Sequence, residues 1–181
     1  LDASFLINSN TLLQQLLKTE ILNNSNIDFE LKIQANKIKN NPNFVKLKMH
    51  SKIKEGLIDL DKTSVEWKDK SKLKIFNSLL FVKNGELVLD GKLEINIIDY
   101  NEIYKQFLTP KNHRKKISKI NLNFTYNFDQ NIAKFKDIRI DGKFNQDVSL
   151  IVNDLLFKKD NLKNKIYLKR IFNEAIKSYA G

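Results

Sequence analysis

The segment from Lys119 to Asp129 (KINLNFTYNFD) alternates apolar and polar side chains along almost its whole length. The apolar positions are Ile120, Leu122, Phe124, Tyr126 and Phe128. Asn and Thr side chains occupy the positions between them. Because successive side chains of a β-strand point to opposite faces, this pattern predicts a strand with one apolar face and one solvated face.

The same period of two residues recurs through the middle of the chain and predicts further strands. They fall at residues 27–35, 45–50, 57–67 (in pieces), 73–82, 87–97 and 132–140. The last of these returns beside 119–129 as a hairpin. Asp-Gly pairs at 90–91 and 141–142 predict turns with a residue at positive φ, either as a weak internal repeat or as two ordinary turns.

A helical period replaces the strand period near both ends and at one internal point. Leucines at helical spacing predict a helix over 11–22. A short helix is expected at 100–108, ending before Pro110. Two closing helices are expected at 146–157, with Asn145 as a candidate N-cap, and at 164–179.

These elements predict an α+β fold, a curved antiparallel β-sheet meander with one apolar face and helices at its ends. A chain of 181 residues suffices for one domain, so we expect a single unit over 1–181. Within it, 1–22 is helical, 27–143 forms the sheet and 146–179 forms a helical cap. The chain begins at Leu1 and shows no signal peptide, so we expect a fragment whose anchor or export signal lies upstream.

The chain is strongly basic, with a net charge of +11, which favours nucleic acid, anionic lipid or acidic partners. Arginine occurs only at 114, 139 and 170, and aromatic side chains fall on apolar faces, which argues against nucleic acid. The densest basic run is KNHRKK at 111–116, a solvated loop or a contact for phosphates. Its candidate anion-binding residues are Lys111, Arg114, Lys115 and Lys116.

The residues needed for catalysis or metal binding are scarce. The chain has no Cys, which excludes disulfides and Cys-based zinc sites. His50 and His113 are the only histidines, and no nucleophile, phosphate-binding or dinucleotide motif occurs. We therefore predict a protein that is not an enzyme, with no cofactor and no metal.

The predicted apolar face is wider than the predicted helices can cover. A helix is about 10 Å wide and a strand occupies about 4.8 Å, so three helices leave part of the sheet uncovered. That part must close on itself, meet further chain or hold an apolar ligand. The candidate groove residues are Leu93, Ile95, Ile97, Leu122, Phe124, Tyr126 and Phe128.

The segment from about Phe76 to Gly181 resembles the C-terminal region of bacterial AsmA-like proteins. The resemblance is carried by strand, turn and helix patterns, while residues 1–75 share only the alternation. The segments concerned are NGELVLDGKLEINIIDYNEIYKQF, FLTPKNHRKKISKINLNFTYNFD, FKDIRIDGKFNQ and IYLKRIFNEAIKSYAG.

The resemblance implies a protein of the Gram-negative envelope, anchored in the inner membrane by an upstream helix and otherwise periplasmic. It also implies a taco-like sheet with an apolar groove, a role in outer-membrane biogenesis, and phospholipid as the molecule handled. Outer-membrane assembly proteins are possible further partners, and the family offers no catalytic residues. Two alternatives remain open: a scaffolding β-domain with a fully internal core, and a basic module that binds polyanions or nucleic acid.

Overall fold

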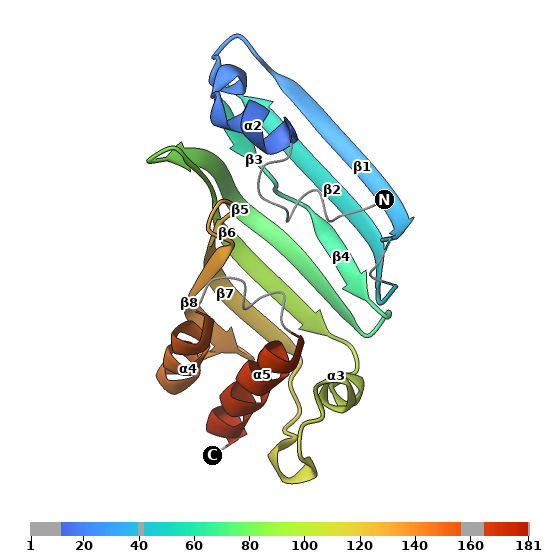
Figure 1. Cartoon of the computed structure of the whole chain (residues 1–181). Helices are drawn as coiled ribbons and strands as arrows, with labels where there is room; N and C mark the ends of the chain where they lie inside the picture. The colour runs from blue at the N-terminus through green and yellow to red at the C-terminus, as the bar shows by residue number, and fades with distance from the viewer. Residues whose placement is uncertain (1–11, 40–41, 157–164, 181) are drawn as a thin grey trace.

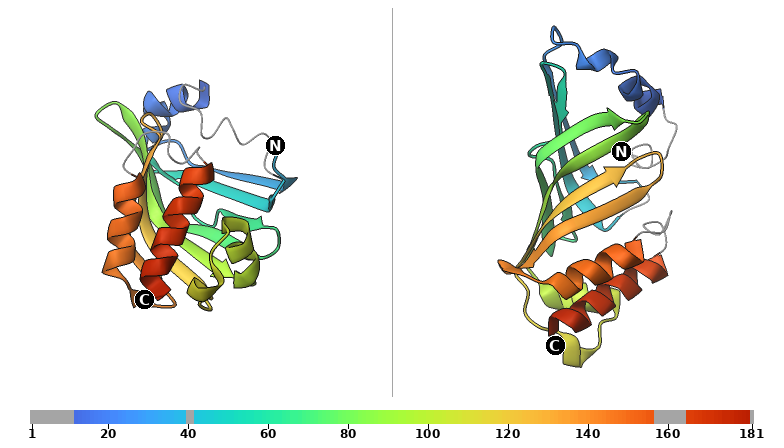
Figure 2. Two further views of the ribbon diagram at one scale, coloured as in Figure 1. Left: turned by 60° about the horizontal axis from the view of Figure 1, so that its bottom comes forward. Right: turned by 90° about the vertical axis from the view of Figure 1, so that its left-hand side faces the viewer.

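The protein is an α+β domain built on one antiparallel sheet of nine strands, as the alternation predicted. The computed structural model describes residues 12–39, 42–156 and 165–180. Figure 1 shows the sheet as a curved wall with helices near its two ends. In Figure 2 the helices of both ends lie on the same side of that wall.

The strands follow one another through the sheet largely in chain order. The order is β1-β2-β3-β5-β6-β7-β8-β9, and β4 also pairs with β2 and β5, so β3 and β4 share one place in the sheet. The strands are β1 (Phe29–Lys37), β2 (Phe44–Lys54), β3 (Leu57–Asp59), β4 (Ser64–Trp67), β5 (Ser71–Lys83), β6 (Glu86–Ile97), β7 (Lys119–Asn127), β8 (Ile132–Ile140) and β9 (Lys143–Phe144).

The described residues form helices where the helical period predicted them. They are α2 (Leu12–Lys18), α3 (Tyr100–Phe107), α4 (Gln146–Leu156) and α5 (Lys165–Ala180), with 3₁₀ turns η1 (Ile21–Asn23) and η2 (Lys111–His113). The helix expected over 11–22 ends earlier, at Lys18, because Glu20 adopts a left-handed backbone with φ of 56°. Residues 11, 157 and 164 of the predicted helices lie outside the described residues.

Side-chain caps explain where the internal helices begin and end. The Asp99 carboxylate accepts hydrogen bonds from the backbone N–H groups of Asn101 and Glu102, at 3.1 and 3.3 Å. Leu108 ends α3 in a left-handed conformation. Asn145 caps α4, as predicted, by accepting from the Val148 N–H at 2.9 Å.

The apolar side chains of the sheet's inner face gather in two buried clusters. The α5 cluster lies under α4 and α5 and contains Tyr104, Ile117, Ile138, Ile140, Val148, Ala175 and Ile176. The α2 cluster, at the opposite end of the sheet, contains Ile53, Ile58, Leu80, Leu87 and Leu89, with Leu17 of α2 packed against it. Helices therefore cover the inner face at both ends.

The turn expected at Asp90-Gly91 is not formed, because these residues lie inside the continuous strand β6. The turn at Asp141-Gly142 is formed, with both residues at positive φ. Gly91 serves a packing purpose instead: it pairs with Phe124 across β6 and β7. A Cβ atom at Gly91 would lie 3.2 Å from both the Phe124 ring and the Ser78 Cβ.

We predict that Gly91→Ala lowers the free energy of unfolding by about 1–3 kcal/mol, because the added methyl overpacks this contact. Urea denaturation measures the change. In a Phe124→Leu background the same substitution should cost less, since one of its two close contacts is gone. Equal stability of Gly91→Ala and the natural protein would contradict this explanation.

Candidate functional site

An apolar cavity of about 440 Å³ lies between the inner face of the sheet and helices α3, α4 and α5. Its sheet side is formed by Leu73, Leu93, Ile95, Ile97, Ile120 and Leu122, among others. Val152, Leu168 and Phe172 line it from the helices, and Phe44 and Trp67 line it from β2 and β4. Ser71 is the one lining residue with a small polar side chain in the part of the chain that the structure describes.

Strand register places these sheet side chains in rows. Leu93 of β6 pairs with Leu122 of β7, and Ile95 pairs with Ile120. On the other side of β6, Ile95 pairs with Leu73 of β5. Because directly paired residues share a face, the alternation within each strand becomes a continuous apolar surface across several strands.

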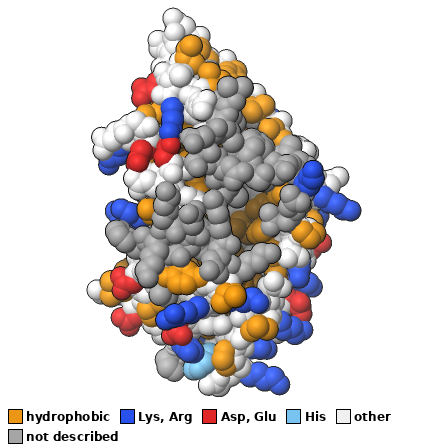
Figure 3. Space-filling model, viewed as in Figure 1, with side chains coloured by type: hydrophobic (Ala, Val, Ile, Leu, Met, Phe, Trp, Pro, Cys, Tyr) orange, Lys and Arg blue, Asp and Glu red, His pale blue; other side chains and the backbone are white. Residues whose placement is uncertain are grey.

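The described residues cover this surface only in part. β7 is an internal strand of the sheet, yet each of its nine residues is only half-buried. In the α5 cluster, by contrast, Ile138, Ile140 and Ile176 are 3–4% exposed. Figure 3 shows hydrophobic side chains within a hollow on this face of the molecule. The partly exposed apolar surface therefore adjoins the α5 cluster, whose Ile138, Ile140 and Ile176 also line the cavity.

Specific contacts hold helix α5 against α3 at one side of the cavity. The rings of Phe107 and Phe172 stack with centroids 4.1 Å apart. The Asn173 amide donates to the Phe107 carbonyl at 3.0 Å, and the hydroxyl of buried Thr109 donates to the Asn173 side chain at 2.7 Å. These contacts hold α5, which forms one wall of the cavity, in place against α3.

Helix α4 is attached to the sheet by one amide side chain. Asn153 accepts from the Phe135 N–H at 2.9 Å and donates to the Phe135 carbonyl at 2.6 Å. Both walls of the cavity are thus joined to the framework by hydrogen bonds as well as by packing.

The size of the cavity suits a flexible apolar molecule. Its volume falls in the range of about 300–1,000 Å³ typical of small-molecule sites. From β4 to β8 the inner face is about 19 Å wide, with strands about 4.8 Å apart. The acyl region of one membrane leaflet is about 15 Å deep. The described residues that line the cavity are almost all apolar, so the cavity can bury apolar surface.

The structure separates the seven predicted groove residues into two groups. Leu93, Ile95, Ile97 and Leu122 line the cavity. Phe124 and Phe128 pack against the α2 cluster instead. Tyr126 meets Phe128 edge-to-face with centroids 4.8 Å apart, and its hydroxyl donates to the Asn131 side chain.

Sequence reasoning did not select Phe44, Trp67 or the lining residues of α5. Trp67 follows Val65 in strand alternation, but only its pairing with Phe44 and Ser71 brings it to the cavity. The helical period marks the apolar side of α5 around Leu168, Ile171 and Phe172. It does not say which part of the sheet that side meets.

The four predicted anion-binding residues lie away from the cavity lining, in the segment after α3. Lys111 begins η2, and Arg114 donates through Nε to the Thr109 carbonyl at 2.9 Å. The Lys115 ammonium lies 5.7 Å from the centre of the Tyr179 ring, near the end of α5. Lys116 is exposed.

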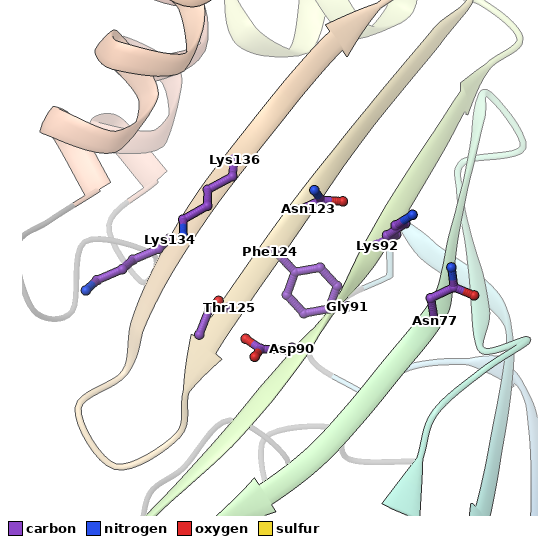
Figure 4. A pocket seen from close by; sticks show the side chains of 9 residues that line it. All are labelled: Asn77, Asp90, Gly91, Lys92, Asn123, Phe124, Thr125, Lys134 and Lys136. Carbon is purple, nitrogen blue, oxygen red and sulfur yellow. The ribbon is translucent and has the colours of Figure 1, made fainter. Parts of the chain in front are cut away.

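The opposite, outer face of the sheet carries a pocket of about 210 Å³, lined mainly by residues with polar or charged side chains. Figure 4 shows Asn77, Asp90, Asn123 and Lys136 among the side chains that four neighbouring strands bring there, with the Phe124 ring beside Gly91. The Asp90 Oδ1 atom is buried and makes no hydrogen bond to the described residues. The two faces of the sheet thus differ sharply in polarity.

A buried tyrosine positions the basic run at 111–116. The Tyr104 hydroxyl donates to the Lys115 carbonyl at 2.6 Å, and the side chain is 1% exposed. Burial raises the pKa of Tyr104 to about 12, because the phenolate would lose its hydration.

We predict that this group makes stability pH-dependent at alkaline pH. The folded pKa is raised above the unfolded value of about 10, so its contribution is complete below pH 10 and is lost as pH rises through about 12. Tyr104→Phe should lower stability by about 1 kcal/mol at neutral pH through loss of the hydrogen bond. It should also flatten the alkaline decline measured by chemical denaturation.

Tyr100→Phe is the matched control, because Tyr100 lies on the same helix and its hydroxyl has no hydrogen-bond partner among the described residues. The control should keep the alkaline decline. An unchanged decline in Tyr104→Phe would contradict the assignment.

Comparisons of the chain with protein family models, curated proteins and solved structures gave no match. Within the described ranges, no three His, Asp or Glu side chains come together as a metal site requires. A search of the same residues found no helix with both the length and the apolar character of a membrane span. The cavity is the feature from which a function can be inferred.

Proposed function

We propose that this protein is a non-enzymatic module that holds the acyl part of a lipid, in the first place a phospholipid, in its apolar cavity. The observation that carries the proposal is the cavity of about 440 Å³ lined by partly exposed apolar side chains of β6 and β7. Exposed apolar surface of this kind marks a binding site more often than an ordinary solvated face.

The energetics suit transient holding. Each buried methylene contributes about 0.8 kcal/mol, so ten methylenes contribute about 8 kcal/mol. Association costs at least about 4 kcal/mol in lost translational and rotational freedom. The balance of a few kcal/mol retains a single acyl chain weakly enough for it to leave, which is what a carrier requires.

A curved antiparallel sheet with an apolar cavity also supports the AsmA-type reading of the sequence. On that reading the module works in the periplasm, attached to the inner membrane through an upstream segment. It would hold or conduct phospholipid during outer-membrane biogenesis, with outer-membrane assembly proteins as further partners.

The basic run at 111–116 keeps its predicted role as a contact for anionic lipid heads in this proposal. Lys111, Arg114, Lys115 and Lys116 do not line the cavity. We assign them to contact with an anionic membrane surface, where each cation near the surface contributes about 1 kcal/mol. They would bring the module to a membrane rather than bind the headgroup of a lipid already in the cavity.

The other two readings have less support. Two fully buried clusters suit a scaffolding domain, but such a domain would also cover the centre of its sheet. A polyanion-binding module needs free cationic side chains, but several lysines of this chain already form ion pairs with acidic side chains. Lys46 pairs with Glu66 and Asp69, and Lys119 pairs with Glu94.

Leu122→Trp tests the proposal, because the larger side chain fills the cavity while remaining apolar. We predict that native mass spectrometry of the natural protein, followed by lipid extraction, shows bound phospholipid. Leu122→Trp should lose most of it. Phe124→Asp is a poorer test, since Phe124 packs against the α2 cluster and Gly91 and its loss would damage the fold.

Asn121→Trp is the matched control, since it places the same side chain next to Leu122 on the outer face. It should keep the lipid. The proposal fails if the natural protein carries no lipid after exposure to phosphatidylethanolamine vesicles. It fails equally if folded Leu122→Trp and Asn121→Trp carry the same amount.

A further inference from the structure

The two edges of the sheet differ in how far their backbone hydrogen-bonding groups are satisfied. At the β8 edge, Asn153 occupies both the N–H and the carbonyl of Phe135, and the two-residue strand β9 pairs with Arg139 and Ile140. The chain thereby occupies with its own groups the middle and the C-terminal end of this edge.

The β1 edge has no such protection. β1 pairs with β2 from Phe29 to Lys37 without a register shift, and no described strand pairs with its other side. It contains no Pro and no Gly, and none of its inner-face residues is charged until Lys37 at its end. Phe29 and Leu31 on that face are 43% and 42% exposed. A long, regular edge of this kind is a template for strand addition.

The charges around β1 indicate what kind of strand fits. Asp28 and Glu30 balance Lys32 and Lys37, so this segment has no net charge in a chain of net charge +11. The edge strand itself thus carries equal numbers of acidic and basic side chains. It suits a strand of the same mixed composition.

We propose that β1 pairs antiparallel with β1 of a second copy of this chain, about a two-fold axis at Leu31. A head-to-tail contact between β1 and β8 is opposed by Asn153 and β9, which leaves the symmetric contact. With the axis at Leu31, residues 29–33 of the two strands pair, and Glu30 of each copy, which also contacts Lys32 and His50 of its own copy, lies opposite Lys32 of the other. The apolar inner faces of the two sheets then join on one side.

Absence of cysteine makes the contact directly testable. Leu31→Cys places two thiols on the axis, where paired Cβ atoms are about 4.5–5.5 Å apart and a disulfide can close with small adjustment. Mild oxidation should convert most of this variant into a covalent dimer on a non-reducing gel. Circular dichroism checks that the sheet is intact.

Two matched variants should stay monomeric under the same oxidation. Phe144→Cys puts a thiol at the other edge, on an equally exposed apolar position of β9. Ile33→Cys keeps the strand but moves the thiols about 13 Å apart, four residues of strand rise. Cross-linking of Ile33→Cys in place of Leu31→Cys would overturn the proposed axis.

Sedimentation of the unmodified protein supplies the equilibrium test. The natural chain should pass from monomer to dimer as its concentration rises from micromolar to hundreds of micromolar. Leu31→Lys should stay monomeric because it sets two like charges against each other on the axis. Leu57→Lys, which changes an exposed residue of β3, should still dimerise.

A natural chain that remains monomeric throughout this range, with no cross-linking of Leu31→Cys, would overturn the proposal. The readout is mass and not bound lipid, so this proposal and the proposed function can fail separately.

Discussion

The structure depends on one constraint: an antiparallel meander puts the apolar side chains of all its strands on the same face, and that face must be covered. Helices at the two ends of the sheet cover part of that face. Helices α4 and α5 lie over one end of the inner face, and α2 lies over the other. The rows formed by Leu93, Leu122, Ile95 and Ile120 adjoin the α4 and α5 end, where Ile120 and Leu122 pack against the α5 cluster. The cavity follows from the mismatch between the width of a nine-stranded sheet and the width of its helices.

Polar contacts attach the helices at both ends to the rest of the structure. Asp129, in the turn between β7 and β8, pairs with Lys18 of α2 and accepts from the Leu87 N–H at 2.8 Å. This contact fastens α2 to the far end of the sheet. At the other end Asn153 and Asn173 attach α4 and α5. With these helices fixed, the described residues leave part of the inner face uncovered.

Local pattern predicted most elements, because strand alternation and helix caps are properties of neighbouring residues. The strand from Lys119 and the helix ending before Pro110 are examples. Positions decided by contacts distant in sequence were not predicted. Gly91 stays in a strand because Phe124 packs against it, and Phe124 joins the α2 cluster because of where α2 lies. Four of the seven predicted groove residues line the cavity, since sequence gives the face but not the place along it.

Trp67 allows the central claim to be measured directly, because it is the only tryptophan and it lines the cavity. The measurement is Trp67 fluorescence during titration with a phospholipid brominated along its acyl chains, since bromine quenches indole only at close range. An open cavity predicts saturable quenching, reversed by competition with the unbrominated lipid. Fluorescence unchanged by the brominated lipid, in a protein that is folded, would mean that the centre of the inner face does not admit an acyl chain.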